Sequence, residues 1–501
     1  MKDKFDALLT RLGEISDFNA AAAVLSWDQQ TYMPPGAAEA RAQMASTLRR
    51  TAHELSTTDE MGQLLDDLEP WAAELDYDSF EAALVRVTRR NYDRALKIPP
   101  DLVARMARAR GLAHAAWEKA RPANDFASFR PHLETMVELN IEMAEALGYE
   151  DGRYDALLDR FEPEMKAAEV KRLFDELKEG LRPIVAAIAD HPDAVDDAVL
   201  HREYDVDGQW AFVNELVGRL GFDWQHGRQD RSAHPFTTSF APTDVRLTTR
   251  LHRDQLQAAL FASIHESGHA LYEQGIPVDL ARTPLAGGAS MAVHESQSRM
   301  WENIVGRSRP FWRYWLPHLR ERFPAQLEGV SVEEFYRAVN RVQPSLIGVE
   351  ADEVTYNMHI FLRFEIEQLM LDEKVAIADL PELWNTKMEK YLGIRPATDT
   401  NGVLQDVHWA GGMMGYFPTY ALGNLLAAQF YAHALADVPD LPAHYERGEF
   451  APLLDWLREN IHVHGHKYTP SELVQRVTGG PISTAPFLDY IRAKYGEIYG
   501  L

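Results

Sequence analysis

The chain has 501 residues, of which 46% are hydrophobic, so it is long enough to bury a large core. Its formal net charge of -25 disfavours binding to nucleic acid and to anionic membranes, but does not disfavour a small peptide. The chain has no cysteine, which excludes disulfide bonds, thiolate metal sites and a cysteine nucleophile, so any transition-metal site must use His, Asp and Glu.

The N-terminal segment is amphipathic, with apolar residues at helical spacing among charges of both signs. It lacks the uninterrupted apolar run and the small-residue cleavage site of a secretory signal. No stretch approaches the roughly 18 apolar residues of a membrane span. We therefore expect a cytoplasmic protein that has neither a membrane nor nucleic acid as a partner.

Most of the chain has an apolar period near 3.6 residues and is rich in Ala, Leu, Glu and Arg, which predicts a mainly α-helical fold. No Pro/Gly/Ser-rich linker divides it, so we expect one large domain over residues 1–501, with the N-terminal helices, about 1–120, as a cover. With boundary errors of roughly 2–4 residues, the predicted helices lie at about 3–24, 36–55, 79–96, 100–120, 129–147, 164–190, 207–220, 252–274, 291–305, 331–341, 350–372, 420–436 and 470–478.

One segment has a different pattern. Residues 234–249 read HPFTTSFAPTDVRLTT, in which Thr and apolar residues alternate on both sides of a Pro-containing turn. Alternation of this kind predicts a β-hairpin or two short strands. The segment lies directly before the helix predicted at 252–274.

That helix carries the motif His265-Glu266-Ser-Gly-His269. Residues four apart share a helix face, so the two imidazoles can bind one Zn²⁺ ion, while Glu266 points about 100° away and can act as general base. The alternative is a pair of surface histidines on an ordinary helix. The apolar residues around the motif indicate a buried helix instead, and buried imidazoles need partners.

A catalytic zinc site needs a third protein ligand. The long metzincin form of this motif is excluded, because Tyr272 and Gly275 stand where it requires Gly and His. A glutamate on the helix predicted at 291–305 remains, and a glycine-containing connection allows that helix to fold back. Glu295 fits this role, and Glu302, two turns further along, is a competing candidate that spacing alone does not exclude.

The whole chain resembles the M32 family of metallocarboxypeptidases, of the carboxypeptidase Taq type. Six elements occur in the family's order over about 400 residues, which makes coincidence implausible. They are Trp27-Asp28-Gln29 with Met33-Pro34, His234-Pro235-Phe236, Asp244-Val-Arg246-Leu-Thr248, His265 to His269, His294-Glu295-Ser296-Gln297, and Gly402-Val-Leu-Gln405-Asp406-Val-His408-Trp409.

The resemblance implies that Glu295 is the third zinc ligand beside His265 and His269. It implies a single, mostly helical zinc-peptidase fold with a deep groove and a small β-sheet beside the active site. The implied activity is removal of C-terminal residues from peptides with broad specificity, supported by Zn²⁺ or Co²⁺. It also implies a homodimer.

A carboxypeptidase must bind the free carboxylate of its substrate, for which an arginine fork is well suited. Arg246 is the first choice, and we place Asp244 and Tyr416 with it in substrate binding. The alternative for Arg246 is an internal ion pair with Asp244. For the oxyanion formed during hydrolysis we expect His408 and Tyr420 as donors, although the tyrosines can equally be core aromatics.

One position departs from the family pattern: Gly348 stands where the family usually has arginine. This weakens the case for strict C-terminal trimming and leaves open an oligopeptidase that cuts internal bonds. A third possibility is a helical scaffold that binds zinc or peptide without turnover. The presence of Glu266 argues against it, because a structural zinc site has no need of a base.

Overall fold

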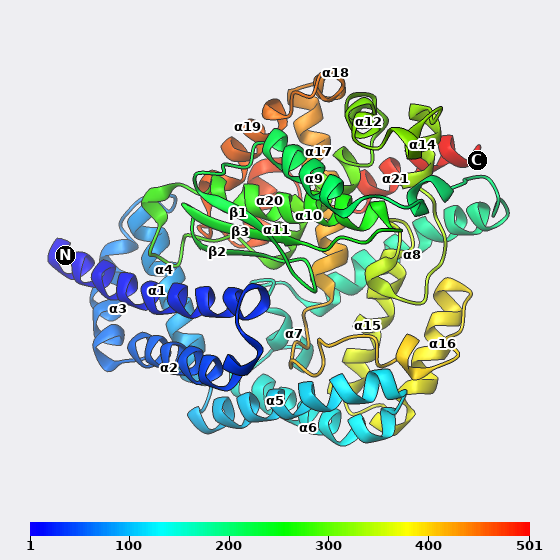
Figure 1. Ribbon diagram of the computed structural model, residues 1–501. Helices are drawn as coiled ribbons and strands as arrows, with labels where there is room; N and C mark the ends of the chain where they lie inside the picture. Colours follow the sequence, from blue (N-terminus) through cyan, green and yellow to red (C-terminus); the bar gives the residue numbers. More distant parts are fainter. The chain divides into compact units, whose positions relative to one another are not determined.

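The computed structural model describes residues 1–501, and most of these residues are in helices (Figure 1). A small sheet contains β1 (Gly227–Arg231), β2 (Thr237–Ala241) and β3 (Asp244–Thr249). The α-helices are α1 (Lys2–Thr31), α2 (Ala38–Ser56), α3 (Asp59–Ala72), α4 (Phe80–Lys97), α5 (Pro100–Ala123), α6 (Phe126–Leu147), α7 (Arg153–Leu158), α8 (Ala167–Ala189), α9 (Val206–Leu220), α10 (Leu256–Gly275), α11 (Met291–Arg299), α12 (Arg309–Arg322), α13 (Pro324–Leu327), α14 (Val332–Val339), α15 (Tyr356–Leu371), α16 (Leu380–Leu392), α17 (Pro418–Asp437), α18 (Leu441–Glu446), α19 (Ala451–Asn460), α20 (Pro470–Thr478) and α21 (Ala485–Tyr499).

The chain forms two compact units, each assembled from three separated segments. The first unit comprises Met1–Ala95, Asp196–Val339 and Leu426–Ile482, and the second comprises Leu96–Val195, Asn340–Leu425 and Ser483–Leu501. The expected single domain, with residues 1–120 as a cover, remains a prediction. Every helix falls short of the combination of length and hydropathy that a membrane-spanning segment needs.

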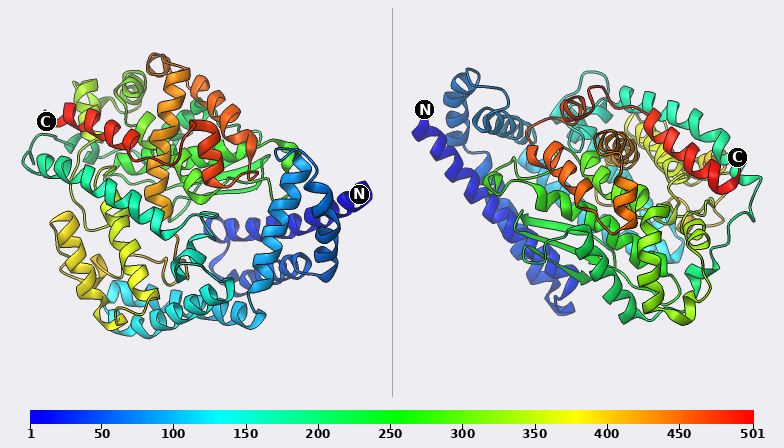
Figure 2. Two further views of the ribbon diagram at one scale, coloured as in Figure 1. Left: turned by 180° about the vertical axis from the view of Figure 1, so that it is seen from behind. Right: turned by 90° about the horizontal axis from the view of Figure 1, so that it is seen from above.

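The sheet of the first unit has β3 at its centre, paired in parallel with β1 and antiparallel with β2. Thr237 of β2 lies opposite Leu247, and Thr238 lies opposite Arg246. Because successive residues of a strand point to opposite faces, Thr237 and the buried Leu247 face α10, whereas Arg246 stacks on Trp27 of α1. α10 and α1 therefore cover opposite faces of the sheet, and Figure 2 shows α1 running alongside the strands.

α10 is the central helix of the first unit. It packs against α9, α11 and the strands, and its residues Leu260, Ile264 and Leu271 are at most 1% exposed. At its C-terminal end, a Cβ on Gly275 would lie 2.2 Å from Nδ1 of the buried His462, so only glycine fits there without displacing that ring. The orientation of α10 is thus fixed by packing on most of its sides.

The N-terminal helices share a hydrophobic core with the segment that connects α10 to α11. On that segment Arg282 has a φ of 62° and forms two hydrogen bonds with Asp17 of α1, at 3.0 and 2.6 Å. Gly13 lets the guanidinium approach, because a Cβ there would lie 2.9 Å from it. The buried residues of this core include Phe5, Leu8, Leu12, Met61, Leu65, Leu68, Leu84, Ile276, Leu280 and Leu285.

The second unit contains the antiparallel neighbours α5 and α6, which lie side by side in Figures 1 and 2, and the buried helix α15. Its last helix, α21, packs against α8, where a Cβ on Gly180 would lie 2.4 Å from Leu488. Glu353, just before α15, forms a buried ion pair with Lys494 of α21 and accepts a hydrogen bond of 2.7 Å from Tyr495. These contacts fix α21 beside the segment that leads into α15.

The mainly α-helical fold with a small sheet is confirmed, and the segment 234–249 forms the β2–β3 hairpin. The range 291–305 is helical but divided, because α11 passes into a π-helix, η4 (Met300–Val305). Several elements were not predicted from the sequence. They are β1, α3, α7, α12, α13, α16, α18, α19 and α21.

Candidate metal centre

Two histidines on α10 present their rings on one face of that helix. His265 and His269 are separated by about one turn, and their ring centroids lie 4.9 Å apart. Both side chains remain partly exposed, at 18% and 16%, although most residues of the helix are buried. The two Nε2 atoms are thus available to a ligand that enters from solvent.

α11 comes unusually close to α10 at a glycine of the motif. A Cβ on Gly268 would lie 2.4 Å from Cα of Ser298 and 2.7 Å from the carbonyl oxygen of Gln297. These are backbone atoms, which cannot move aside as a flexible side chain can. Ser290, the residue before α11, caps the helix, because its hydroxyl accepts the N–H of Val293 at 3.1 Å. The glycine therefore permits a backbone-to-backbone contact between the two helices.

This contact brings the carboxylate of Glu295 to the two imidazoles. Its Oε2 lies 3.8 Å from Nε2 of His265 and 3.5 Å from Nε2 of His269. The three side chains form a group whose ligand atoms all lie within 4.8 Å of one another. The competing candidate, Glu302, approaches the other nitrogen of His265 instead.

Glu302 lies on the π-helix η4, and its Oε2 accepts a hydrogen bond of 2.9 Å from Nδ1 of His265. Arg299 and Arg307 also donate to its carboxylate, each at 3.3 Å. Burial alone would raise the pKa of Glu302, but Arg299, His265 and Arg307 lower it to about 2. Burial likewise opposes ionisation of Glu295, yet Arg299 and the histidines hold its pKa well below the ordinary value.

His269 is held by a second imidazole rather than directly by a carboxylate. Its Nδ1 lies 2.7 Å from Nδ1 of His294, and Nε2 of His294 donates to Glu273 at 2.7 Å. In the tautomer in which Nε2 of His294 carries the hydrogen, Nδ1 of His269 donates and Nδ1 of His294 accepts. Burial lowers the pKa of His269 to about 4, against the hydrogen bond with Glu295, so the ring is neutral at pH 7. Neutral imidazole is the form that binds a metal.

Glu266 lies beside the sheet, on a different side of α10 from the histidine nitrogens. The hydroxyl of Thr237 on β2 donates to its carboxylate oxygen Oε2 at 2.6 Å and contacts its backbone carbonyl at 2.9 Å. Burial raises the pKa of Glu266 above the ordinary value, while His265 and Thr237 act in the opposite direction. A carboxylate of this kind is well suited to accept a proton near neutral pH.

The donor set fits a divalent metal with a preference for nitrogen and oxygen. Two Nε2 atoms and one carboxylate oxygen converge, while the two Nδ1 atoms point away and are hydrogen-bonded, as metal-binding imidazoles usually are. Three protein ligands leave further positions open, which is typical of a catalytic rather than a structural zinc site.

Arg246 and Asp244 lie together in the first unit. The guanidinium donates to both carboxylate oxygens of Asp244, at 2.9 and 2.8 Å, and stacks on Trp27 at 4.3 Å from the ring centroid. The neighbouring strand repeats this pattern, because Arg228, opposite Arg246 in the register, pairs with Asp230. The internal ion pair is thus formed through Nε and Nη2, and Nη1 takes no part in it.

The residues that we expect to contact the oxyanion lie together in the second unit. Nε2 of His408 lies 3.3 Å from the hydroxyl of Tyr420, and its ring stacks on Tyr416 at a centroid distance of 5.9 Å. On the other side, Nδ1 of His408 lies 3.9 Å from Asp406, which accepts a hydrogen bond of 2.6 Å from the buried Arg363. The structure therefore brings His408, Tyr416 and Tyr420 together.

Gly348 belongs to the same surroundings in the second unit. Its N–H donates to Oε1 of Gln405 at 3.0 Å, and Gln405 also accepts from Arg363 at 2.8 Å. A Cβ at position 348 would lie 3.2 Å from that guanidinium and 3.5 Å from Nδ1 of His359. A side chain at position 348 would therefore start next to the guanidinium of Arg363.

The loop that carries His408 is held by a buried acid on α15, Glu367. It accepts hydrogen bonds from Tyr154, Trp409 and the N–H of Gly415, at 2.8, 3.0 and 3.1 Å. Burial raises the pKa of Glu367 to about 7 against the effect of these three donors. The folded state therefore retains a proton that the unfolded chain has released above its ordinary pKa of 4.5.

This shift predicts a pH dependence of stability. As the pH rises from about 4.5 to about 7, Glu367 should lower the unfolding temperature of the wild type, because ionising Glu367 costs more in the folded state. Glu367→Gln should be less stable at low pH, since the amide cannot accept all three donors, and should lack this decline. The buried histidines His269, His359 and His462, whose pKa values are lowered by burial, act in the opposite direction in both proteins, so the difference between the two proteins carries the prediction. Thermal unfolding of both proteins across this range measures the difference. Parallel curves would contradict the shifted pKa.

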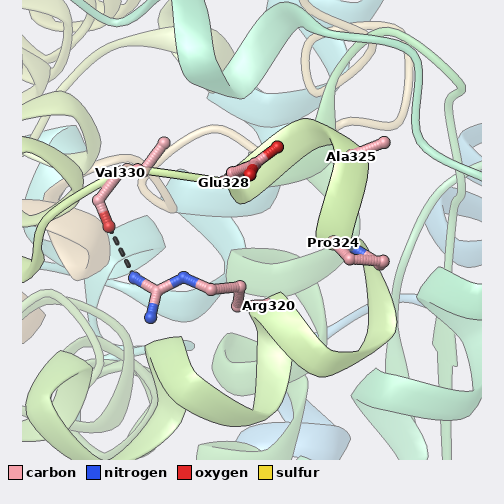
Figure 3. Close-up of a pocket in the computed structure, with 6 residues that line it drawn as sticks. Arg320, Pro324, Ala325, Glu328 and Val330 are labelled. Atoms are coloured by element: carbon pink, nitrogen blue, oxygen red, sulfur yellow. Dashed lines mark hydrogen bonds between the residues drawn. The ribbon is translucent and has the colours of Figure 1, made fainter.

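A surface hollow of about 540 Å³ lies elsewhere in the first unit, around α12 and α13. Figure 3 shows that the guanidinium of Arg320 is turned to the carbonyl oxygen of Val330, at 2.6 Å. Arg320 also donates to the carbonyl of Leu327. Because the guanidinium is hydrogen-bonded to backbone carbonyls, the hollow is a weaker candidate for a functional site than the histidine cluster on α10.

Three functional positions escaped the sequence analysis. Arg299 lies four residues from the proposed ligand Glu295 and donates to it, and that spacing was a usable signal. Glu273 contacts His294, the partner of His269, and its contact depends on the packing of α11 against α10. Thr237 had no such signal, because its contact with α10 depends on the packing of a strand against a helix.

Comparisons with known proteins identify a metallopeptidase family. Residues 7–495 match the family model described as Carboxypeptidase Taq (M32) metallopeptidase. The chain is 45% identical to thermostable carboxypeptidase 1 of Thermus thermophilus, over 99% of each chain, and 39% identical to carboxypeptidase 1 of Bacillus subtilis, over 99% of this chain and 98% of that one. It is similar to the crystal structure of an M32 carboxypeptidase from Deinococcus radiodurans, with a TM-score of 0.96, 42% identity and full coverage of both chains.

Proposed function

The chain belongs to the carboxypeptidase Taq (M32) family of metallopeptidases and is a metallocarboxypeptidase, and from that premise we propose how it acts. It removes residues from the C-terminus of peptides with broad specificity. Zn²⁺ is the resident metal, with Co²⁺ as a substitute, held by His265, His269 and Glu295. The converging Nε2, Nε2 and Oε2 atoms are the observation that carries this proposal.

When bound, Zn²⁺ supplies a Lewis acid that lowers the pKa of water toward about 7 and polarises the scissile carbonyl. Glu266 accepts the proton that hydrolysis releases and passes a proton to the departing amine. Its raised pKa supports both steps, and Thr237 orients the carboxylate. His265 and His269 are kept in the metal-binding tautomer by Glu302 and His294.

The free edge of β2 is the proposed docking site for an extended peptide. In the order β1-β3-β2, only one side of β2 pairs within the sheet, and Thr237 at its start touches the general base. A substrate strand can therefore add to this edge through backbone hydrogen bonds, which explains acceptance of many side chains. Oxyanion donation is assigned to His408 and Tyr420, supported by their mutual hydrogen bond.

A second candidate, an oligopeptidase that cuts internal bonds, is favoured by Gly348. The family pattern has a cation at this position that would be suited to the substrate carboxylate, and this chain has none. Arg363 does not replace it, because its nitrogens already donate to Asp406, Gln405 and the carbonyl of His359.

Two peptides of identical sequence separate these activities, one with a free C-terminus and one amidated. We expect stepwise shortening of the free peptide only, abolished by chelation and restored by Zn²⁺, because exopeptidase action depends on the terminal carboxylate. Mass spectrometry of the products measures this. Internal cleavage of both peptides would favour the oligopeptidase, and the absence of any metal-dependent product would favour a non-catalytic scaffold.

A further inference from the structure

Arg299 contacts two carboxylates of the metal centre at once. Its Nε donates to Oε1 of Glu295 at 2.7 Å, and its Nη1 donates to Oε2 of Glu302 at 3.3 Å. The side chain of Arg299 is only 14% exposed, and both carboxylates are more deeply buried still. Ion pairs that are shielded in this way are strong and directional compared with surface pairs.

The two oxygens of Glu295 have different partners. Oε1 is taken by Arg299, whereas Oε2 is the oxygen that lies 3.8 and 3.5 Å from the Nε2 atoms of His265 and His269. A free carboxylate can bind a metal through one oxygen or through both. Here the charge-assisted hydrogen bond at Oε1 opposes the second mode.

The same guanidinium connects Glu295 to His265 through a second path. Glu302 accepts from Arg299 and from Nδ1 of His265 on the same atom, Oε2. Glu295, Arg299 and Glu302 follow one another at spacings of four and three residues, so all three side chains lie on one side of the α11–η4 helix. Arg299 therefore links the proposed ligand Glu295 on α11 to the proposed ligand His265 on α10.

We propose that Arg299 is a positioning residue that makes Glu295 a one-oxygen ligand through Oε2 and couples it to the orientation of His265. This inference rests on the proposed metal site. Its consequence is that one coordination position stays open that a two-oxygen glutamate would fill. This role requires the forked guanidinium of arginine as well as its positive charge, because a lysine presents a single point charge and cannot bridge two carboxylates.

Arg299→Gln and Arg299→Lys test the proposal, with Co²⁺ as the probe in the full-length protein. In wild type, Co²⁺ should give a strong absorption spectrum in the visible, typical of low coordination number. Both variants should give weaker, shifted bands, because Glu295 then binds through both oxygens. Zn²⁺ affinity, measured by competition with a chromophoric chelator, should fall about 10- to 100-fold.

Arg307→Gln is the matched control. Arg307 also donates to Glu302, but to its other oxygen, and its remaining nitrogens bond Asn303 and the carbonyl of Val339. Its Co²⁺ spectrum should match that of wild type. Unfolding temperatures of the metal-free proteins report damage to the fold, and if Arg299→Gln does not fold, Arg299→Lys carries the comparison.

The outcomes are distinguishable. Variant spectra and zinc affinities equal to those of wild type would overturn the role of Arg299 and leave the metal site intact. Recovery of the wild-type spectrum by lysine would also overturn it, since charge alone would then suffice. If wild type itself bound no Co²⁺ at His265 and His269, the proposed function would fail rather than this inference.

Discussion

Replacing Glu266 with glutamine will abolish peptide hydrolysis and leave metal binding intact. The amide has nearly the same shape, and its oxygen can still accept the hydroxyl of Thr237 that now lies 2.6 Å from the carboxylate. Unlike the carboxylate, however, an amide cannot take up the proton that hydrolysis releases. Loss of a general base lowers kcat by about 10²- to 10⁴-fold. Assays of kcat with a short free peptide and of zinc content test both parts.

A pair of neighbouring threonines supplies the control. Thr237→Val removes the hydroxyl that orients Glu266 and should lower kcat with little effect on zinc affinity. Thr238→Val removes a hydroxyl from the opposite face of the same strand and should leave kcat unchanged. The mechanism would be wrong if Glu266→Gln retained wild-type turnover, or if it failed to bind zinc while remaining folded.

Replacing Gly268 with alanine will weaken both the fold and the metal site. The added methyl group would meet the backbone of α11 at 2.4 to 2.8 Å, at Ser298 and Gln297, so the two helices must separate. Overpacking of this kind costs about 1–3 kcal/mol of stability. Because Glu295 is on α11 and the histidines are on α10, separation also pulls the three ligands apart. A displacement of about 1 Å can lower activity about 10²-fold.

Thermal unfolding and chelator competition measure these two effects. Gly287→Ala is the control, because it lies in the connection between the same helices, has no atom within 4 Å of its added Cβ, and does not require a positive φ. It should behave like wild type. Wild-type zinc affinity in Gly268→Ala would show that the close approach of α10 and α11 is dispensable.

The sequence predicted the helix that carries His265 and His269 well for a physical reason. The motif from His265 to His269 lies within a long buried segment whose helical pattern is strong, and ligand spacing on a helix is a local property. The third ligand is different, because Glu295 and Glu302 lie seven residues apart on one helix face. Only the packing of α11 against α10, through Gly268, distinguishes them.

Some of the missed elements have features that are common in loops. β1 reads Gly-Arg-Gln-Asp-Arg, which has no apolar alternation, because its pairing with β3 rather than its composition makes it a strand. α12, α16, α19 and α21 each have proline in the first turn, where a missing N–H costs nothing. The predicted start of α15 at 350 was early, because Asp352 accepts the N–H groups of Val354 and Thr355 and caps the turn before the helix.

The contact of Gly275 and Gln297 with His462 has a consequence for biosynthesis. His462 fills the space against Gly275 and lies 3.0 Å from the side-chain oxygen of Gln297, so it completes the packing behind both ligand-bearing helices. The ribosome makes this histidine long after it has made α10 and α11. The nascent chain therefore carries all three ligands well before their surroundings exist, and a rigid metal centre can form only near the end of translation.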